Sequence, residues 1–318
     1  MPMNAVLAEL SFRGFGNTKE DKSVTDETKA RLGLTNKKAG KWQKFLLPPA
    51  ALKRITEMQG AARREHDLLT LKWSKGMGML AISGREAYET RMERCRGRWR
   101  EAVDDFCATY WSVHIPAARE MLGSTFNSAD YPPADRIRSY FSFTYTIFPV
   151  PDASHFDARL QEIYSGQLTT EVNRRVGEAV AELWTRLLEP VQKMAERLNN
   201  PEAVFRDSLV GNIQQIVEIM PALNLTGDSR IAQATAQIQA ELANLDPEKL
   251  RKDGAVRARA AVSANNIIAS FGAMGMRSVL LEPTQHDADE PPSAPPPDDD
   301  PANTEPAAAP AAGEEEPA

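Results

Sequence analysis

The chain has few of the residues that build disulfides and metal sites, with two cysteines and four histidines among 318 residues. Cys95 and Cys107 fall on one predicted helix, where a rise of about 1.5 Å per residue separates them by roughly 18 Å, too far for a disulfide. No histidine has metal-ligand spacing or a cysteine pair nearby. The sequence therefore indicates a reducing compartment and predicts no metal and no cofactor.

Long apolar runs are also missing. The first residues, MPMNAVLAELSF, contain neither the basic nor the long apolar segment of a secretion signal. No apolar run approaches the roughly 20 residues that a membrane helix needs. We therefore expect a cytoplasmic protein with no membrane partner.

Positive charge is absent from one part of the chain. Residues 282–318 contain eleven Asp and Glu, ten prolines and no Lys or Arg, a composition that predicts a disordered acidic tail, either a solubiliser or an interaction tail. The rest has 38 basic and 33 acidic residues, a net charge of +5. Its first 100 residues have 21 basic and 11 acidic residues, or +10. This asymmetry indicates a polyanion or an acidic partner for the N-terminal third.

The 42% hydrophobic content suffices for a core, and its pattern predicts a mainly α protein with a small β-sheet of two or three strands. Alternating apolar residues predict strands at 5–12 and 141–150. Between them, apolar spacings of three and four predict two long amphipathic helices, 49–73 and 84–114, that cover one face of the sheet. A capping-box pattern, Ser83 with Glu86, is expected to begin the second helix, and Pro116 to end it.

From Asp152 onward the pattern predicts helices almost throughout. Pro190 is expected to kink or divide the first of them, and another begins near Asn199. Asp228 and Asp246 are expected to cap two more. The predicted organisation is a basic α+β region at 1–151, a helical bundle region at 152–281 and the disordered Pro/Ala/acidic tail at 282–318.

Two basic stretches form the candidate binding surface. Residues 29–56 carry eight Lys and Arg, no acid, and the aromatic residues Trp42 and Phe45, which is typical of a groove where cations pair with phosphates and rings stack on bases. The alternative is a solvated loop with Trp42 in the core. On the second long helix, residues 91–100 include five arginines, and Glu93 is their only acidic residue. The two basic stretches are predicted to form one continuous track. The candidate nucleic-acid contacts are Lys37, Lys38, Lys41, Trp42, Lys44, Lys53, Arg54, Arg91, Arg94, Arg96, Arg98 and Arg100.

The other sequence patterns give weaker evidence of function. Phe141, Phe143 and Tyr145 are typical of a core strand, with a base-stacking platform as the alternative. Ala39, Gly40 and Lys41 look like the end of a phosphate loop, but the residues around them do not fit it. Asp104 and Asp105 have no matching carboxylates for a metal nuclease. Because no catalytic signature remains, we predict a protein that is not an enzyme.

The segments TLKWSKGMGMLAISGREAYE and YPPADRIRSYFSFTYTIFPVP resemble an uncharacterised family, a domain of unknown function of bacteriophages and mobile elements. The resemblance covers about residues 5–155. It implies a strand, a helix, a glycine-containing segment, a long charged helix and an aromatic strand. Family members are often encoded near MoxR-type ATPases and von Willebrand A-domain proteins, which implies an ATPase partner. In layout, a basic body with an acidic tail also resembles phage single-stranded DNA-binding proteins.

The leading prediction is a non-enzymatic phage or mobile-element protein that binds nucleic acid, preferentially single-stranded DNA. It would act as an accessory factor in replication, recombination or transcription in the host cytoplasm, with its tail recruiting a phage polymerase or an ATPase. The alternatives are an adaptor or scaffold for an AAA-type ATPase and a virion or assembly protein. The sequence leaves open whether the chain forms a homo-oligomer.

Overall fold

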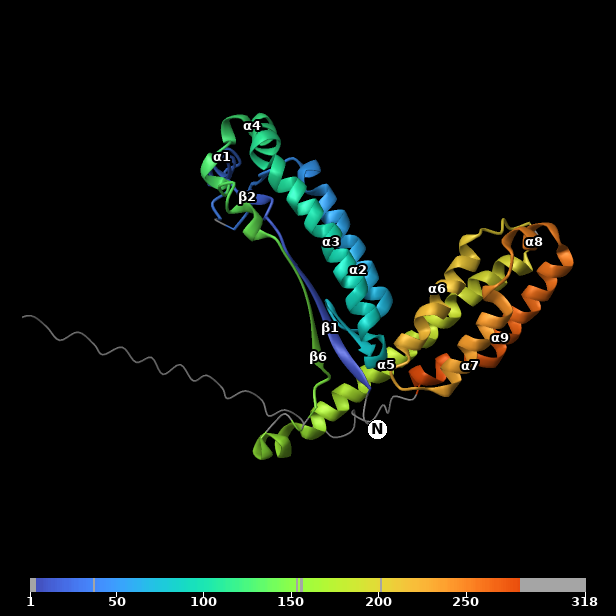
Figure 1. Cartoon of the computed structure of the whole chain (residues 1–318). Helices are drawn as coiled ribbons and strands as arrows, with labels where there is room; N and C mark the ends of the chain where they lie inside the picture. Colours follow the sequence, from blue (N-terminus) through green and yellow to red (C-terminus); the bar gives the residue numbers. More distant parts are fainter. Residues whose placement is uncertain (1–3, 37, 153, 155–156, 201, 281–318) are drawn as a thin grey trace, which may run out of the picture. The chain divides into compact units, whose positions relative to one another are not determined.

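The computed structural model describes residues 4–36, 38–152, 154, 157–200 and 202–280 (Figure 1). Within these ranges the chain is mainly helical and carries a four-stranded antiparallel sheet, which confirms the predicted α+β class. The described residues belong to one compact unit that includes both predicted regions, 1–151 and 152–281. The predicted tail at 282–318 lies outside the described residues.

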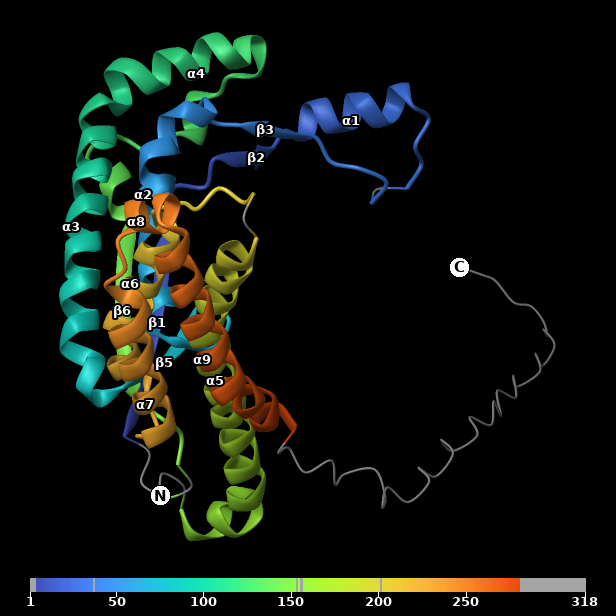
Figure 2. The ribbon, with the colours of Figure 1, turned by 90° about the vertical axis from the view of Figure 1, so that its right-hand side faces the viewer.

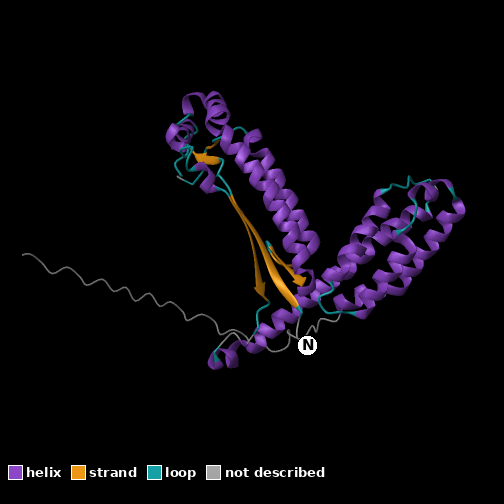
Figure 3. Ribbon diagram, viewed as in Figure 1, coloured by secondary structure: helices purple, strands orange, loops and turns teal. Residues whose placement is uncertain are grey.

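The main sheet has the strand order β4-β5-β1-β6. Strands are drawn in orange in Figure 3. β1 pairs with β6 from Val6 opposite Pro149 to Arg13 opposite Ser142, which confirms the two predicted strands and joins the N-terminus to the middle of the chain. The sheet is larger than the predicted one, because two of its four strands were not predicted. The four strands are β1 (Ala5–Arg13), β4 (Leu71–Ser74), β5 (Met77–Ala81) and β6 (Ser142–Pro149).

The β4–β5 hairpin begins where the first long helix was predicted to continue to Trp73. Gly76 forms the turn with φ +75°, a backbone conformation that favours glycine. Gly78 of β5 lies against the side chain of Thr70, where a Cβ atom would overlap the hydroxyl. A separate small sheet pairs two short strands that flank a helix: β2 (Thr18–Glu20), α1 (Lys22–Arg31) and β3 (Gln43–Phe45).

Two helices pack side by side on one face of the sheet, as predicted: α2 (Lys53–Leu69) and α3 (Arg85–Thr109). They are antiparallel, because Arg54 pairs with Asp105 at one end and Glu65 pairs with Arg91 at the other. The predicted start of α2 at Pro49 is a short 3-10 helix, η1 (Pro49–Leu52).

Both predicted end signals of the long helix are wrong. Among the described residues no side chain caps the start of α3, where Gly84 is the N-cap. Pro116 does not end the helical run: the chain passes through a π-helical turn, η3 (Tyr110–His114), into α4 (Ile115–Leu122). Pro116 is the second residue of α4, a first-turn position that tolerates proline. Gly123, with φ +52°, is the C-cap of α4.

The C-terminal half is a bundle of helices. α5 continues through Pro190 and ends at Asn199, and the next helix starts later than predicted, at Ser208. The predicted caps are confirmed, since Asp228 and Asp246 each accept a backbone N–H at a helix start. The helices are α5 (Ala158–Asn199), α6 (Ser208–Leu223), α7 (Ser229–Ile238), η8 (Gln239–Ala243), α8 (Pro247–Lys252) and α9 (Gly254–Leu280).

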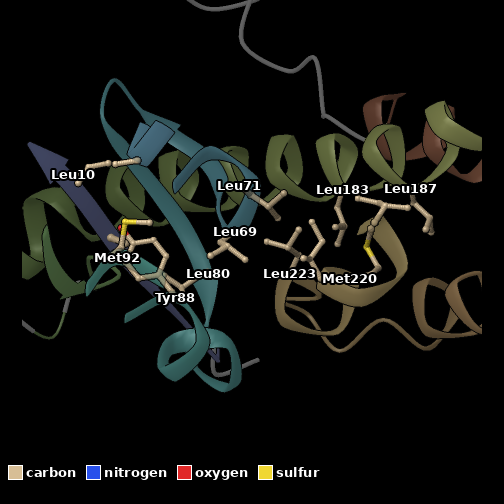
Figure 4. Close-up of a cluster of buried hydrophobic side chains, with 14 of the residues drawn as sticks. Leu10, Leu69, Leu71, Leu80, Tyr88, Met92, Leu183, Leu187, Met220 and Leu223 are labelled. Carbon is tan, nitrogen blue, oxygen red and sulfur yellow. The ribbon is translucent and has the colours of Figure 1, made fainter. Parts of the chain in front are cut away.

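One apolar core joins the sheet to this bundle (Figure 4). Leu71 of β4 and Leu80 of β5 are almost fully buried, as are Leu183 of α5 and Leu223 of α6. No helix in the described part of the chain combines the length and the apolar character needed to cross a membrane. The remaining short helical turns are η2 (Ile82–Gly84), η4 (Gly123–Thr125), η5 (Ser128–Asp130) and η6 (Ile137–Tyr140).

Candidate nucleic-acid interface

The arginines of α3 are held outward by the residues that the helix buries. Tyr88, Met92, Trp99 and Phe106 face the sheet and are almost fully buried. The side chains between them point away from the core because a helix separates its faces by residue spacing. The first two-thirds of α3 therefore present their arginines at the surface.

Ion pairing divides these arginines into two groups. Arg91 is 3.1 Å from Glu65 and 3.4 Å from Glu218. Arg96 pairs with Glu93 at 2.5 Å and lies over the ring of Tyr145. The other three are exposed and form no ion pair with any residue that the structure describes, and we call them the α3 arginine face: Arg94, Arg98 and Arg100.

Gly97 lies in the middle of the α3 arginine face. A Cβ atom at this position would meet nothing within 4 Å, so packing does not require a glycine here. A glycine inside a helix costs about 1 kcal/mol relative to alanine. Its presence leaves the helix backbone open between Arg94 and Arg98, where a ligand can approach closely.

The basic segment between α1 and β3 is exposed. Lys38 forms no ion pair with a described residue, whereas Lys41 pairs with Glu20 at 2.8 Å. The side chain of Trp42 is 38% exposed and that of Phe45 is 54% exposed, so neither has the buried position of the core alternative. Lys37 lies outside the described residues.

Lys44 does not fit the predicted interface. Only 5% of its side chain is exposed, and its ammonium group lies 3.0 Å from Asp130, 3.2 Å from Asp21 and 2.7 Å from the carbonyl oxygen of Thr125. Burial opposes its positive charge, but hydrogen bonds to the two aspartates outweigh burial and raise the pKa of Lys44. A buried ammonium group with three partners cannot also bind a phosphate, so this part of the prediction is wrong.

The two basic stretches meet across acidic residues. The α1, β2 and β3 segment lies at the α4 end of the α2–α3 pair (Figures 1 and 2). Lys53 and Arg54 lie at the start of α2, where Glu57 and Asp105 pair with them. Arg100, the last arginine of the cluster on α3, precedes Asp105 by five residues, or about 7.5 Å along the helix. Ion pairs therefore occupy the cations at the start of α2, and the continuous track stays a prediction.

The aromatic residues of β6 confirm the core interpretation. Phe143 is 7% exposed and packs edge to face on Trp99, with ring centroids 5.9 Å apart. The Tyr145 hydroxyl donates a hydrogen bond to Glu93 at 2.6 Å. Burial, aided by this carboxylate, raises the pKa of Tyr145 to about 12. Phe143 is therefore not available as a base-stacking platform.

A second positive site was not expected from the sequence. Arg13 ends β1, and the η6 turn precedes β6, so the pairing of the two strands brings these segments together. They surround a cavity of about 460 Å³ lined by Arg13, Gly14, Arg136, Ser139 and Tyr140. Two arginines beside buried Ile137 in the ADRIRSY segment were the available signal, but a 3-10 turn has no apolar period that shows which of them faces outward.

One buried polar pair has a structural role. His66 is buried and shares a 2.8 Å hydrogen bond with the Tyr88 hydroxyl. Burial lowers the pKa of His66 and raises that of Tyr88. Across the described ranges, no three or more His, Cys, Asp or Glu side chains gather in a way that could hold a metal ion.

Comparison of the chain with protein-family models, curated proteins and solved structures finds no match. The resemblance to the phage and mobile-element family therefore stays a prediction.

Proposed function

We propose that this chain is a non-enzymatic protein that binds nucleic acid, preferentially single-stranded DNA, as an accessory factor in replication, recombination or transcription. The observation that carries the proposal is the α3 arginine face, three exposed guanidinium groups that form no ion pair with a described residue. Such groups neutralise phosphates and release counterions with little sequence readout. Gly97 between them allows close approach of a sugar–phosphate backbone.

The preference for a single strand is supported by Trp42. Trp42 is partly exposed on the segment that also carries Lys38, so a base can stack on its ring while a phosphate meets this lysine. A duplex keeps its bases stacked on each other and gains less from this ring. Replacing Trp42 by Ala should therefore weaken binding to a single strand about fivefold or more and leave duplex binding almost unchanged.

The test is fluorescence anisotropy with a labelled single strand and its duplex across a salt series. The triple variant Arg94→Gln, Arg98→Gln, Arg100→Gln should bind all sequences more weakly. Loss of three phosphate contacts should reduce the slope of log K against log salt by about 2 for a single strand.

The matched control changes the same amount of charge elsewhere. Arg159, Arg206 and Arg259 are exposed and form no ion pair in the described part of the chain. Their triple replacement by Gln should leave the salt slope close to that of the unmodified chain. Equal slopes in the two triple variants would refute the assignment of the α3 arginine face.

A second candidate is an adaptor or scaffold for a partner protein such as an AAA-type ATPase. Exposed apolar side chains favour it: Leu32 is 60% exposed, and Leu34 and Phe45 lie exposed on the same segment. Replacing Leu32 and Leu34 by Ser should then abolish co-purification with a protein that stays bound after nuclease treatment. Retention of the partner by this variant would exclude the segment as its docking site.

A further inference from the structure

The cavity at the end of β1 has the composition of an anion site. Its volume is about 460 Å³, and its lining includes two arginines, a hydroxyl and an aromatic ring but no carboxylate. Arg13 and Arg136 are exposed and form no ion pair with the described residues. The nearby Arg138 does have a partner, since it pairs with Asp104 of α3. Arg13 and Arg136 are therefore free to receive an anion from solvent.

The ring of Tyr140 gives the cavity a flat apolar surface. Its side chain is 45% exposed, and Phe15 holds it from one side, edge to face, with ring centroids 6.2 Å apart. An aromatic ring that is fixed and still half-exposed can stack on a nucleobase. The cavity thus combines guanidinium groups with a stacking surface.

The turn that carries these groups is held in place before any ligand binds. Ile137 of η6 is fully buried. The hydroxyl of Ser139 donates to the carbonyl oxygen of Arg136 at 2.7 Å, and the backbone N–H of Arg136 donates to that of Pro133 at 2.9 Å. A site that needs little ordering loses less free energy when it binds.

We propose that this cavity binds a nucleoside phosphate. Arg13 and Arg136 would hold the phosphate, whose oxygens match the planar donors of a guanidinium group, and Tyr140 would stack on the base. The same chemistry is presented by a free nucleotide and by one nucleotide unit of a single strand. The proposal does not rest on the α3 arginine face, because the two sites share no residue.

The experiment is isothermal titration of the full chain with deoxyadenosine monophosphate, deoxyadenosine and a single-stranded deoxyadenosine decamer. The double variant Arg13→Gln, Arg136→Gln should bind the nucleotide or the decamer at least tenfold more weakly. Tyr140→Ala should weaken the same ligand about fivefold or more. Tyr140→Phe keeps the ring and should stay within about twofold of the unmodified chain. The control is Arg206→Gln, Arg259→Gln, which removes the same charge elsewhere and should have no effect.

The ligand that responds identifies the source of the phosphate. If the double variant loses binding of the nucleotide but not of the decamer, the cavity binds a free nucleotide. If the double variant loses binding of the decamer, the cavity binds one nucleotide unit of a strand. The proposal is overturned if the double variant binds both ligands as the control does, or if deoxyadenosine binds as tightly as its monophosphate. A normal melting temperature for each variant shows that it is folded.

These outcomes are separate from those of the proposed function. If the α3 triple variant loses decamer binding while the Arg13 and Arg136 variant keeps it, and the unmodified chain binds no nucleotide, the proposed function stands and this cavity is not a site. If the cavity binds the nucleotide and no form of the chain binds the decamer or a duplex, the proposed function fails and this inference stands.

Discussion

The role of each arginine in this chain depends on the groups that lie beside it. Arg186 donates to the carbonyl oxygen of Asp67 at the end of α2, and Arg257 donates to that of Leu198 at the end of α5. Both stabilise helix ends, where carbonyl groups lack partners. Arg94 has neither a carbonyl nor a carboxylate partner in the described ranges, which is why it, and not Arg186, is a candidate for binding a phosphate.

Gly97 gives a test at a single residue. Gly97→Ala should raise the free energy of unfolding by about 0.5–1 kcal/mol, because alanine restricts the unfolded chain and meets nothing in the folded one. If a strand passes over this position, the added methyl group should also weaken oligonucleotide binding. Urea unfolding and fluorescence anisotropy measure the two effects.

The matched control for this substitution is Gly211→Ala in α6. Gly211 is also an exposed helical glycine with no atom near its missing Cβ. This variant should gain similar stability and keep the affinity of the unmodified chain. Equal affinity in both variants would show that no ligand approaches the backbone at Gly97.

His66 predicts how stability depends on pH. Burial lowers its pKa in the folded state below the value of about 6.5 in the unfolded chain. The unfolded state then binds more protons, so this contribution to stability is complete above pH 6.5 and is lost as the pH falls below it. Urea unfolding at pH 7.5 and 5.5 should show a smaller loss for His66→Gln than for the unmodified chain. Equal losses would assign the pH dependence to other groups.

At the scale of elements, the clearest contact between the sheet and the bundle lies at one edge of the sheet. The β4 edge is covered by side chains of α5: Glu182 accepts the backbone N–H of Lys72 at 3.0 Å, and Arg175 donates to the carbonyl oxygen of Trp73 and lies over its ring. β6 forms the other edge. α5 therefore completes the hydrogen bonding of an edge strand while it connects the sheet to the bundle.

Glu182→Ala should loosen this edge. The N–H of Lys72 loses its acceptor, so the chain should lose about 1 kcal/mol of stability and the Lys72 amide should exchange faster with solvent. Glu178→Ala is the control, because Glu178 pairs only with Arg174 on the exposed side of α5 in the described structure. Amide exchange measured by NMR distinguishes them. Equal protection of Lys72 in both variants would contradict a role of Glu182 at the edge.

Elements with a clear period were predictable from the sequence, and elements without one were not. Burial alternates along β6, β1 keeps an apolar residue at every second position from Val6 to Phe12, and α3 repeats its buried residues every three or four positions. β5 has no such alternation, because four of its five residues are buried, and β4 has only four residues. The prediction that Pro116 ends the helical run was wrong because a π-helical turn places this proline at the start of a new helix.

At the scale of the whole molecule, the candidate sites depend on contacts between distant segments. Lys44 looked like its basic neighbours in sequence and became buried because Asp130, far along the chain, pairs with it. The cavity joins Arg13 to Arg136 through the pairing of β1 with β6. Composition could identify a positive N-terminal third, but only the fold decides which charges remain free.

The separation of charge along the chain leads to a last prediction. The whole chain has a net charge of -6, whereas residues 1–281 have 38 basic and 33 acidic residues, or +5. A form that ends at Leu281 should therefore bind a single strand more tightly at low salt, because a positive net field attracts phosphates and a negative one repels them.

A salt series and an amide-substituted variant distinguish an effect of the charge of residues 282–318 from an effect of their bulk. The advantage of the shorter form should shrink as salt rises, since the screening length falls from about 10 Å at 0.1 M to about 3 Å at 1 M. A full-length chain with the eleven acidic residues of 282–318 changed to Asn and Gln should behave like the shorter form. If it instead binds like the unmodified chain at low salt in fluorescence anisotropy, the charge of residues 282–318 does not act on the basic surface, and any gain from their removal comes from their bulk.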